Sequence, residues 1–514
     1  MIDARTNGQV RRSDRSTAPV NGPEDAVLDW RSMDWPRMMA AVQRLRQRIF
    51  TASHKGNWKQ VRNLQKLMLR SYANAVLSVR RVTELNAGKN TPGVDGRVIV
   101  TPEGKARLAR LVHHLGSTVD AHPARRVYIP KANGKRRPLG IPVILDRARQ
   151  ALVVNALEPE WEAQFDSRSY GFRPGRSAQD AIAAIFQVAR GPQARRLWVL
   201  DADLTGAFDH IAHAPLLAAL GTFPARPLVQ GWLQAGVVEQ SQWHPTEAGT
   251  PQGGVISPLL LNIALQGMEA AAGVRYATNN RTHRDSPVLI RYADDFVVFC
   301  TSQEQIEEVQ HRLTRWLHAR GLSFNADKTR VVHLAEGFDF LGFHVRRYGT
   351  KLLIKPSPEA LRRHRQHLRA ELHGLRGLNA PQVIHRLNPL IRGWTNYYRT
   401  VVSSVAFASL DRYLWQLLYK WAKYSHSNKP KRWIVQRYFG PFHPKRQDRW
   451  VFGDTATGLY GVKHAWTSIR RHRLVRGGAS PDNPAQVQYW AVRQRRTGHS
   501  AGSTRLSGVT ERLP

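Results

Sequence analysis

The chain has 514 residues, which is enough for three or four domains that each bury a core. Lys and Arg number 77 against 38 Asp and Glu, and this excess of 39 positive charges is spread along the chain among Trp and Tyr residues. Such a distribution favours nucleic acid over an anionic membrane surface as a partner. The single cysteine, Cys300, excludes internal disulfides and cysteine-rich zinc modules. With no apolar run of about 18 residues and no signal-peptide core, we expect an intracellular, cytoplasmic protein without a membrane segment.

The first part of the chain changes from a polar segment to basic helices. Residues 1–30 are polar, with scattered Pro, Gly and charge, so we expect them to be disordered. Residues 31–85 have helical periodicity with one apolar and one strongly basic face, which indicates a helical extension that faces a polyanion. Two strands are then predicted within 127–143, joined around Asn133 and Gly134, a strong hairpin-turn pair.

The middle of the chain alternates helices and strands irregularly. Helices are expected at 145–162 and 178–189, and a short buried strand at 197–204. A loop that feeds a buried helix occupies 249–265, and an apolar, β-branched hairpin follows at 288–299. This irregular alternation predicts an α+β block with a partly antiparallel sheet.

Helices dominate again from Ser357. The run Ser357-Pro358-Glu359 combines an N-cap residue, a first-turn proline and an early acid. Apolar residues three or four apart mark one face of a later helix: Phe407, Leu410, Leu414, Leu417 and Trp421. We expect a small helical bundle with basic surfaces, followed by a basic and aromatic tail that Pro and Gly interrupt.

Three carboxylates lie within apolar surroundings. Asp294 and Asp295 occupy the tip of the 288–299 hairpin, in RYADDFVVF, where a plain turn is the simplest interpretation because Asp is a common turn residue. Asp203 ends the earlier strand, and adjacent strands of one sheet would bring it to the pair. Carboxylates gathered in a basic protein attract Mg²⁺, which suits phosphoryl transfer by two ions about 4 Å apart. Rival ligands are more simply explained as loop or capping residues: Asp166, Asp201 and Asp209.

Between about residues 80 and 440 the chain resembles the bacterial group II intron-encoded reverse transcriptases, or maturases. Any one motif is weak, but their combination in this order is highly specific. Eight motifs and a helical signature carry the resemblance: NTPGVDG (90–96), YIPKANGKRRPLGIP (128–142), SYGFRPGRSAQDAI (169–182), DADLTGAFD (201–209), GTPQGGVISPLLLNI (249–263), RYADDF (291–296), NADKT (325–329), FDFLGF (338–343) and RLNPLIRGWTNYYR (386–399).

The resemblance implies an α+β right-hand polymerase with an antiparallel palm sheet. Residues 86–350 would form fingers and palm, 356–440 a helical thumb and maturase domain, and 441–514 a basic, DNA-binding-like tail. Longer family members end in a DNA-cutting module with paired cysteines and histidines, which we expect this chain to lack because it has one cysteine. Synthesis on target DNA would then draw on another primer, such as one at a replication fork.

The resemblance also implies the catalytic site. Asp203, Asp294 and Asp295 match the metal-binding aspartates, and with Leu204 they would hold two Mg²⁺ ions that activate the primer 3′-hydroxyl and stabilise the departing pyrophosphate. In that context the hairpin turn becomes the scaffold of a metal site.

The same resemblance implies a deoxynucleotide site. Lys131 and Arg137 match a pair that grips the incoming triphosphate, although a solvated basic hairpin is the alternative. Phe208 matches the aromatic residue that crowds the sugar 2′ position, with a buried core phenylalanine as its rival. Gln252 matches a residue near the nascent base pair, where glycines allow close backbone approach, or it belongs to a plain loop. Lys328 matches a lysine proposed to protonate pyrophosphate.

The activity implied is RNA-directed DNA synthesis on an RNA template with a DNA primer, combined with binding of the intron RNA to promote its splicing and mobility into target DNA. Two other functions remain open: a splicing-only RNA-binding maturase, and a domesticated relative in defence or repair. The oligomeric state is left open too. Six residues are expected to contact RNA: Arg362, Arg363, Arg365, Arg369, Arg392 and Trp394.

Overall fold

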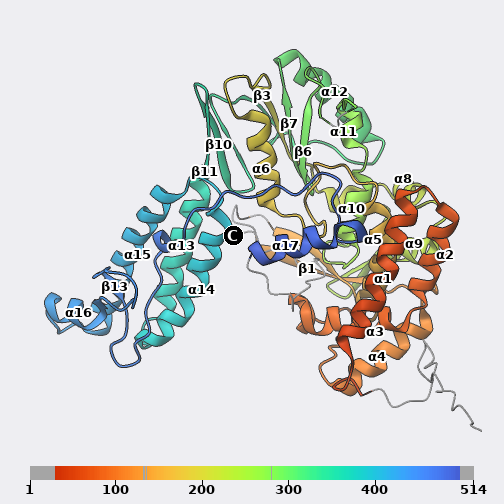
Figure 1. The fold of residues 1–514 in the computed structure, drawn as a ribbon. Helices are drawn as coiled ribbons and strands as arrows, with labels where there is room; N and C mark the ends of the chain where they lie inside the picture. The colour runs from red at the N-terminus through yellow and green to blue at the C-terminus, as the bar shows by residue number, and fades with distance from the viewer. Residues whose placement is uncertain (1–28, 131–133, 135, 279–280, 498–514) are drawn as a thin grey trace, which may run out of the picture.

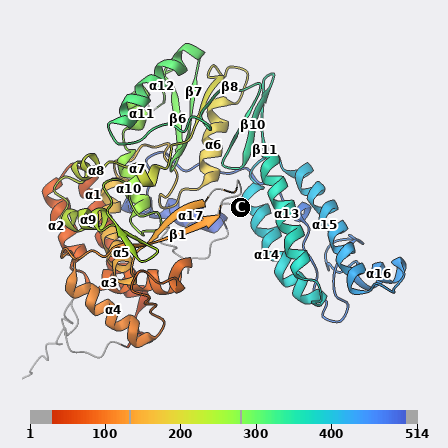
Figure 2. The same cartoon turned by 180° about the vertical axis from the view of Figure 1, so that it is seen from behind.

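The computed structural model describes residues 29–130, 134, 136–278 and 281–497 (Figure 1). The chain forms a mixed helix and sheet body and a separate helical arm, which Figure 2 shows from behind. The expected disorder of residues 1–30 falls almost wholly outside the described residues, as does Lys131. Within the described ranges, no helix combines the length and the apolar character that crossing a membrane requires.

The N-terminal helices confirm the predicted helical extension. Side chains of Asp34, Asn57, Ser71 and Thr101 accept backbone N–H groups at the starts of four helices, which satisfies donors that a helix leaves unpaired. The helices pack around α5 (Ile144–Glu162), which is buried on all sides. They are α1 (Trp35–His54), α2 (Trp58–Leu69), α3 (Tyr72–Arg80), the short turns η1 (Arg81–Leu85) and η2 (Ala87–Asn90), and α4 (Pro102–Leu115).

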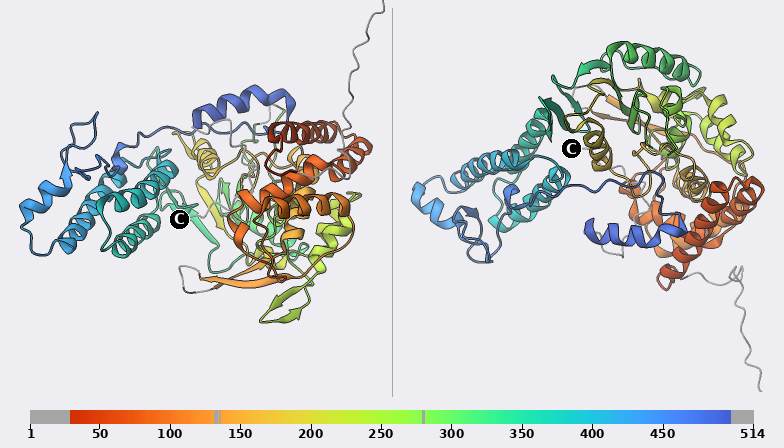
Figure 3. Two further views of the ribbon diagram at one scale, coloured as in Figure 1. Left: turned by 90° about the horizontal axis from the view of Figure 1, so that it is seen from below. Right: turned by 45° about the horizontal axis from the view of Figure 1, so that its top comes forward.

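The fingers contain a four-stranded sheet in the order β2-β1-β4-β5. The predicted hairpin is confirmed, because β1 (Ala124–Pro130) and β2 (Arg136–Ile141) pair antiparallel. A second hairpin, β4 (Val237–Glu239) and β5 (Gln242–His244), was not predicted, and β4 joins β1 in parallel. Both hairpins project from the body in the left view of Figure 3.

The palm contains an antiparallel sheet in the order β6-β7-β3-β8. Its strands are β6 (Val288–Tyr292), β7 (Asp295–Cys300), β3 (Trp198–Ala202) and β8 (Arg330–His333). Alternate residues enter two different cores, because Leu200 and Val298 pack with α12 (Gln303–His318) whereas Val199 and Val297 pack with α6 (Ala178–Ala189). Burial on both faces explains the continuous apolar sequence of these strands.

Further helices complete the palm and fingers. The core that includes α12 also receives apolar side chains from most of these short helices. They are α7 (Ala207–His210), α8 (His213–Leu220), α9 (Arg226–Gln234), α10 (Ser257–Ala264) and α11 (Met268–Ala271).

A three-stranded sheet, in the order β11-β10-β9, leads from the palm to the helical thumb. The thumb encloses its own apolar core, and Phe407, Leu410, Leu414 and Trp421 of α15 are buried as predicted. Leu418 is buried more fully than the predicted Leu417. The elements are β9 (Phe338–Phe340), β10 (Phe343–Tyr348), β11 (Lys351–Pro356), α13 (Pro358–Gly374), α14 (Ala380–Tyr398), α15 (Ser404–Ser425) and α16 (Lys431–Tyr438).

The C-terminal region folds back onto the body. After the short strands β12 (Phe439–Gly440) and β13 (Val451–Phe452) and the turn η3 (His464–Trp466), residues 467–493 run from the thumb across to the N-terminal helices (Figures 1 and 3). We call residues 467–493 the C-terminal strap, and it includes η4 (Pro484–Gln486) and most of α17 (Val487–Thr497). Much of the expected basic tail is thus part of the packed structure.

Candidate active site

Strand pairing brings the three catalytic candidates together. In the palm sheet Ala202 of β3 lies opposite Phe296 of β7, so Asp203, the next residue, falls beside Asp295. The carboxyl groups of Asp203 and Asp295 are within hydrogen-bonding reach of each other. Two groups far apart in the sequence therefore meet at one edge of the sheet.

The β6–β7 turn presents the acidic pair. Tyr292 pairs with Asp295, which leaves Ala293 and Asp294 as the two turn residues. Ala293 has a φ of 60°, a left-handed conformation that alanine rarely adopts. The turn interpretation and the carboxylate-site interpretation therefore describe the same hairpin tip.

The crowding of the acids changes their proton affinity. Burial, the charge of Asp294 and the charge of Asp203 raise the pKa of Asp295 well above its ordinary value. Burial raises the pKa of Asp294 too, with a further contribution from Asp203. Like charges held together in a partly buried place are costly, and a divalent cation relieves that cost.

The donor set fits a hard cation. All side-chain donors are carboxylate oxygens, the type that Mg²⁺ prefers. Leu204 could add only its main-chain carbonyl, because its side chain is apolar and buried. Across the part of the chain that the structure describes, no three His, Cys, Asp or Glu side chains form a complete metal cage. The site is thus a contacting pair of carboxyl groups with Asp294 as a charged neighbour.

Lys328 is the nearest cation to this pair. Its Nζ atom bonds to Oδ2 of Asp203, and this bond raises the pKa of Lys328. The Lys328 side chain is 63% exposed, so its charge can leave without opening the core. The main chain holds the same segment, because Asn325 N–H donates to the Asp203 carbonyl at 2.8 Å.

Gln252 lies where the fingers meet the palm. Its carbonyl accepts the N–H of Gly140 in β2 at 3.0 Å. A Cβ atom on Gly253, which has a φ of 134°, would come 2.8 Å from the Gly140 carbonyl oxygen. The close backbone approach inferred for these glycines is therefore present, and it ties the loop to the fingers hairpin.

The Phe208 side chain packs in the protein core and is not exposed to solvent. Its ring lies edge-on to Phe172 with centroids 6.2 Å apart, and the side chain belongs to the body core. The Phe208 carbonyl accepts the N–H of Thr250 at 2.7 Å, which links it to the Gln252 loop. These contacts agree with the core interpretation of Phe208, and its role at the sugar 2′ position stays a prediction.

Among the described residues of the fingers hairpin, Arg137 carries a charge that affects the acidic pair. Arg137 is exposed on β2, and its charge lowers the pKa of Asp294 against the larger effect of burial. The charge of Arg137 therefore acts on the acidic pair at the hairpin tip.

The rival acids have other partners. Asp209 faces Arg126 at 3.9 Å, and Asp166 accepts the side-chain amide of Gln266 at 3.3 Å. Burial raises the pKa of Asp201 to about 7, and the charge of Arg330 opposes this rise. Asp166 is a loop residue, as expected, whereas Asp201 is a residue of β3 and Asp209 lies in α7, so the loop or capping interpretation does not hold for Asp201.

The predicted RNA-contacting residues divide into two groups. Arg362, Arg369 and Arg392 are exposed on α13 and α14. Arg365 instead reaches α15, where its Nη2 donates to Ser409 Oγ at 2.8 Å, and Arg363 is half-buried. The prediction for Trp394 needs correction: its side chain is 6% exposed and stacks on His364 at 4.8 Å, so it packs the thumb core and offers RNA almost no surface.

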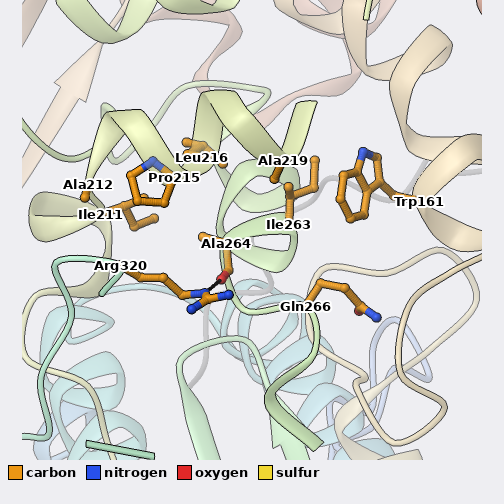
Figure 4. Close-up of a pocket in the computed structure, with 10 residues that line it drawn as sticks. All are labelled: Trp161, Ile211, Ala212, Pro215, Leu216, Ala219, Ile263, Ala264, Gln266 and Arg320. Carbon is orange, nitrogen blue, oxygen red and sulfur yellow. Dashed lines mark hydrogen bonds between the residues drawn. The ribbon is translucent and has the colours of Figure 1, made fainter. Parts of the chain in front are cut away.

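An apolar pocket elsewhere on the palm is separate from the acids (Figure 4). Arg320 is the charged residue at its edge, and its Nε already donates to the Ala264 carbonyl at 3.1 Å. None of the three aspartates lines this pocket, so it is no part of the carboxylate site. Its lining is Trp161, Ile211, Ala212, Pro215, Leu216, Ala219, Ile263, Ala264, Gln266 and Arg320.

Sequence reasoning missed the residues that support the turn. Arg291, inside the RYADDF motif, is 1% exposed, and Asn262 on α10 is buried beside it. A charged residue within a β-branched, apolar run was the available signal, because burying an arginine is costly unless it has a purpose.

Comparison with known proteins agrees with the fold. The reverse transcriptase (RNA-dependent DNA polymerase) family model matches residues 129–345, the N-terminal domain of reverse transcriptase matches 30–112, and the group II intron maturase-specific domain matches 361–439. The chain therefore belongs to the group II intron-encoded reverse transcriptase and maturase family. Its polymerase domain is of a class that generally uses divalent metal ions.

Individual relatives cover different shares of the chain. Protein YkfC of Escherichia coli is 35% identical over 54% of this chain and 83% of its own length. The group II intron-encoded protein LtrA of Lactococcus lactis is 29% identical over 52% of this chain, which spans about half (54%) of LtrA. Maturase-like protein 1 of Euglena gracilis is 25% identical over 71% of this chain and 76% of its own length.

Proposed function

We propose that Asp203, Asp294 and Asp295 form the catalytic centre of an RNA-directed DNA polymerase and hold two Mg²⁺ ions, with the Leu204 carbonyl as a further ligand. The observation that carries this proposal is the strand register, which sets Asp203 at the end of β3 beside Asp295 of β7, with Asp294 in the adjoining turn. Bound Mg²⁺ would ease deprotonation of a primer 3′-hydroxyl and stabilise charge on the leaving pyrophosphate.

The surrounding residues suit a deoxynucleoside triphosphate. Arg137, together with Lys131, would neutralise phosphate charge. Phe208 would limit space at the sugar 2′ position, and Gln252 would lie along the nascent base pair. Lys328 would move from Asp203 to the triphosphate once cations occupy the acids, because its exposed side chain is free to swing.

The experiment that tests the polymerase assignment is primer extension on an RNA template with the Asp294→Ala, Asp295→Ala double variant. We expect the variant to remain folded and to lose synthesis, because both carboxylates are ligands. Synthesis at the wild-type rate would refute the assignment.

We also propose that the thumb binds intron RNA and promotes splicing, with entry into target DNA following from both activities. The exposed Arg362, Arg369 and Arg392 support this, since they lie within the maturase-specific match. Phosphate contacts from these arginines would make binding fall steeply with salt. Such chemistry would take place in the cytoplasm, where RNA and nucleotides are available.

The two activities separate by mutation. The double aspartate variant should still promote splicing, whereas charge reversal at Arg362, Arg369 and Arg392 should abolish it. If reversal leaves RNA affinity and its salt dependence unchanged, the RNA-binding face is elsewhere.

A further inference from the structure

The hairpin turn that carries Asp294 is under local strain. Ala293 is the first of two turn residues, the position where a positive φ normally calls for glycine. A left-handed conformation is unfavourable for alanine, so surrounding contacts must hold it in place.

Gly171 closes one side of the turn. A Cβ atom at this position would come 2.3 Å from the backbone nitrogen of Ala293, so only glycine fits. The same loop pairs with the edge of β6, because Tyr170 N–H donates to the Arg291 carbonyl at 2.9 Å and Arg291 N–H donates to the Arg168 carbonyl at 3.0 Å. The turn is therefore packed against backbone that cannot retreat freely.

Arg291 closes the other side from within the core. One of its guanidinium nitrogens, Nη1, donates to the Ala293 carbonyl at 3.1 Å and to Asn262 Oδ1 at 3.0 Å. Asn262 Nδ2 in turn donates to the Gly171 carbonyl at 2.9 Å. Arg291, Asn262 and Gly171 thus form a continuous hydrogen-bonded bracket around the turn.

Burying the Arg291 guanidinium in this bracket also destabilises the fold. Arg291 Nε and Nη2 are buried without a hydrogen-bond partner among the described residues, and burial lowers the Arg291 pKa to about 10. Buried donors without a partner destabilise a fold, so packing alone gives no reason for an arginine here. The hydrogen bond to the Ala293 carbonyl provides a reason for an arginine at this position.

We propose that Arg291 is a positioning residue of the polymerase site: by holding the Ala293 carbonyl, together with Asn262, it fixes the direction in which Asp294 and Asp295 present their carboxylates. This inference rests on the proposed function of those two acids. Lysine cannot replace the arginine fully, because its flexible stem and rotatable ammonium do not hold one donor nitrogen between the two acceptors as the rigid, planar guanidinium holds Nη1.

The test compares Arg291→Lys with Arg173→Lys. Arg173 is also buried and lies next to the same loop, but its guanidinium bonds to Glu162, Asp166 and Ser169 and to none of the turn residues 292–295. Both variants should lose thermal stability. Loss of a residue that orients metal ligands typically costs about 10–100-fold in metal affinity or activity.

We expect Arg291→Lys alone to lower kcat about 30-fold, to raise the half-saturating Mg²⁺ concentration about tenfold, and to leave the deoxynucleotide KM within about threefold. Mn²⁺ binding to the protein with primer and template, followed by electron paramagnetic resonance without nucleotide, should weaken about tenfold as well. Arg291→Lys behaving like Arg173→Lys in both kcat and Mn²⁺ affinity would overturn the proposal.

Asn262→Ser provides a second variant should Arg291→Lys fold poorly. It should lower kcat about fivefold to tenfold, and the double variant should be no worse than Arg291→Lys alone, because both act through one bracket. Independent, multiplicative losses would contradict the bracket. If the wild-type protein extends no primer, the proposed function itself is wrong. If the wild type is active, Asp295→Asn is inactive and Arg291→Lys is unaffected, only the positioning role of Arg291 is wrong.

Discussion

Two groups of acidic residues in this protein differ in the cations that bond to them. In the C-terminal strap, Asp482 accepts two bonds from Arg46 of α1, at 2.8 and 2.7 Å, and Arg46 also donates to Glu158 of α5 at 2.6 Å. At the palm, Asp203 lies beside Asp295, and the exposed Lys328 bonds to Asp203. The first arrangement satisfies its acids with a fixed arginine, and the second leaves its acids able to take another cation.

A second acid of the strap interface makes the same contrast. Asp180, at the start of α6, accepts His472 Nε2 at 2.8 Å, Arg493 Nη2 at 2.7 Å and the N–H of Val475 at 2.9 Å. Burial alone would raise the pKa of Asp180, but the bonds and charges of His472 and Arg493 lower it overall. The partners of Asp180 thus keep its pKa low, whereas burial and repulsion push the pKa of Asp294 and Asp295 upward.

The largest expected effect is the loss of catalysis at the crowded acids. Asp295→Asn should reduce primer extension at least about 10³-fold, equivalent to about 4 kcal/mol in the barrier, because it removes a charged metal ligand. The same variant should be more stable than wild type by about 1 kcal/mol at pH 8, because it relieves repulsion. Steady-state kinetics and thermal unfolding check the two effects. A variant that is both inactive and strongly destabilised would contradict the contrast between the palm acids and the strap acids.

Removing a strap acid should have the reverse effect. Asp482→Asn leaves Arg46 with Glu158 as the one acid that it still bonds among the described residues, and breaking a buried pair in this way costs about 3 kcal/mol of unfolding free energy. Denaturant unfolding measures the loss, while the kcat of the folded fraction should stay within about twofold. Glu308→Gln is the matched control, since its pair with Arg312 is exposed and worth at most about 0.5 kcal/mol. Equal losses in the two variants would show that the strap pair does not hold the body together.

The pH dependence of stability separates the two groups further. Because the folded-state pKa of Asp295 is raised, the folded protein binds its proton more readily, and stability gained from this residue increases as pH falls from above that pKa toward about 4. The difference in unfolding free energy between wild type and Asp295→Asn should therefore shrink on acidification. A difference that is constant from pH 8 to pH 5 would mean that Asp295 titrates normally.

A smaller effect is expected at Phe208. Phe208→Val should reduce discrimination against ribonucleotides by about 1–3 kcal/mol, because space opens at the sugar 2′ position. It should also cost about 1–2 kcal/mol of stability, because part of the ring is in the core. Competition between deoxynucleotide and ribonucleotide incorporation measures the first effect, and unchanged discrimination would leave Phe208 as a core residue alone.

The smallest effects are expected on the thumb surface. Arg392→Gln should weaken RNA binding a few-fold and reduce the salt slope by about one unit, because one phosphate contact is lost. Arg365→Gln is the control, since its guanidinium is bonded to α15. Binding isotherms at several salt concentrations distinguish the two, and an equal reduction in slope would show that Arg365 also reaches RNA.

Prediction from the sequence succeeded where local pattern determines structure. The palm strands are apolar, β-branched runs, and the Asn133-Gly134 signal marked the fingers hairpin. The contact between Asp203 and Asp295 depends on which strands pair, which periodicity does not specify. The β4–β5 hairpin was missed because strands of three residues are too short to show alternation.

Other errors had tertiary causes. The C-terminal strap is irregular and rich in Pro and Gly, so its attachment depends on distant partners such as Arg46. Trp394 offered a signal that was overlooked: it continues the apolar stripe of Leu387, Ile391 and Tyr398 on α14, at spacings of three and four. The role of Arg291 could not be inferred without seeing the turn that it contacts.

The most direct test of the central claim is a structure of the protein with primer, RNA template, an incoming nucleotide and Mn²⁺, read by anomalous scattering. We predict two peaks about 4 Å apart, in contact with the carboxylates of Asp203, Asp294 and Asp295. Peaks elsewhere, or a single peak that Asp203 does not touch, would contradict the assignment of these acids as a two-metal polymerase centre.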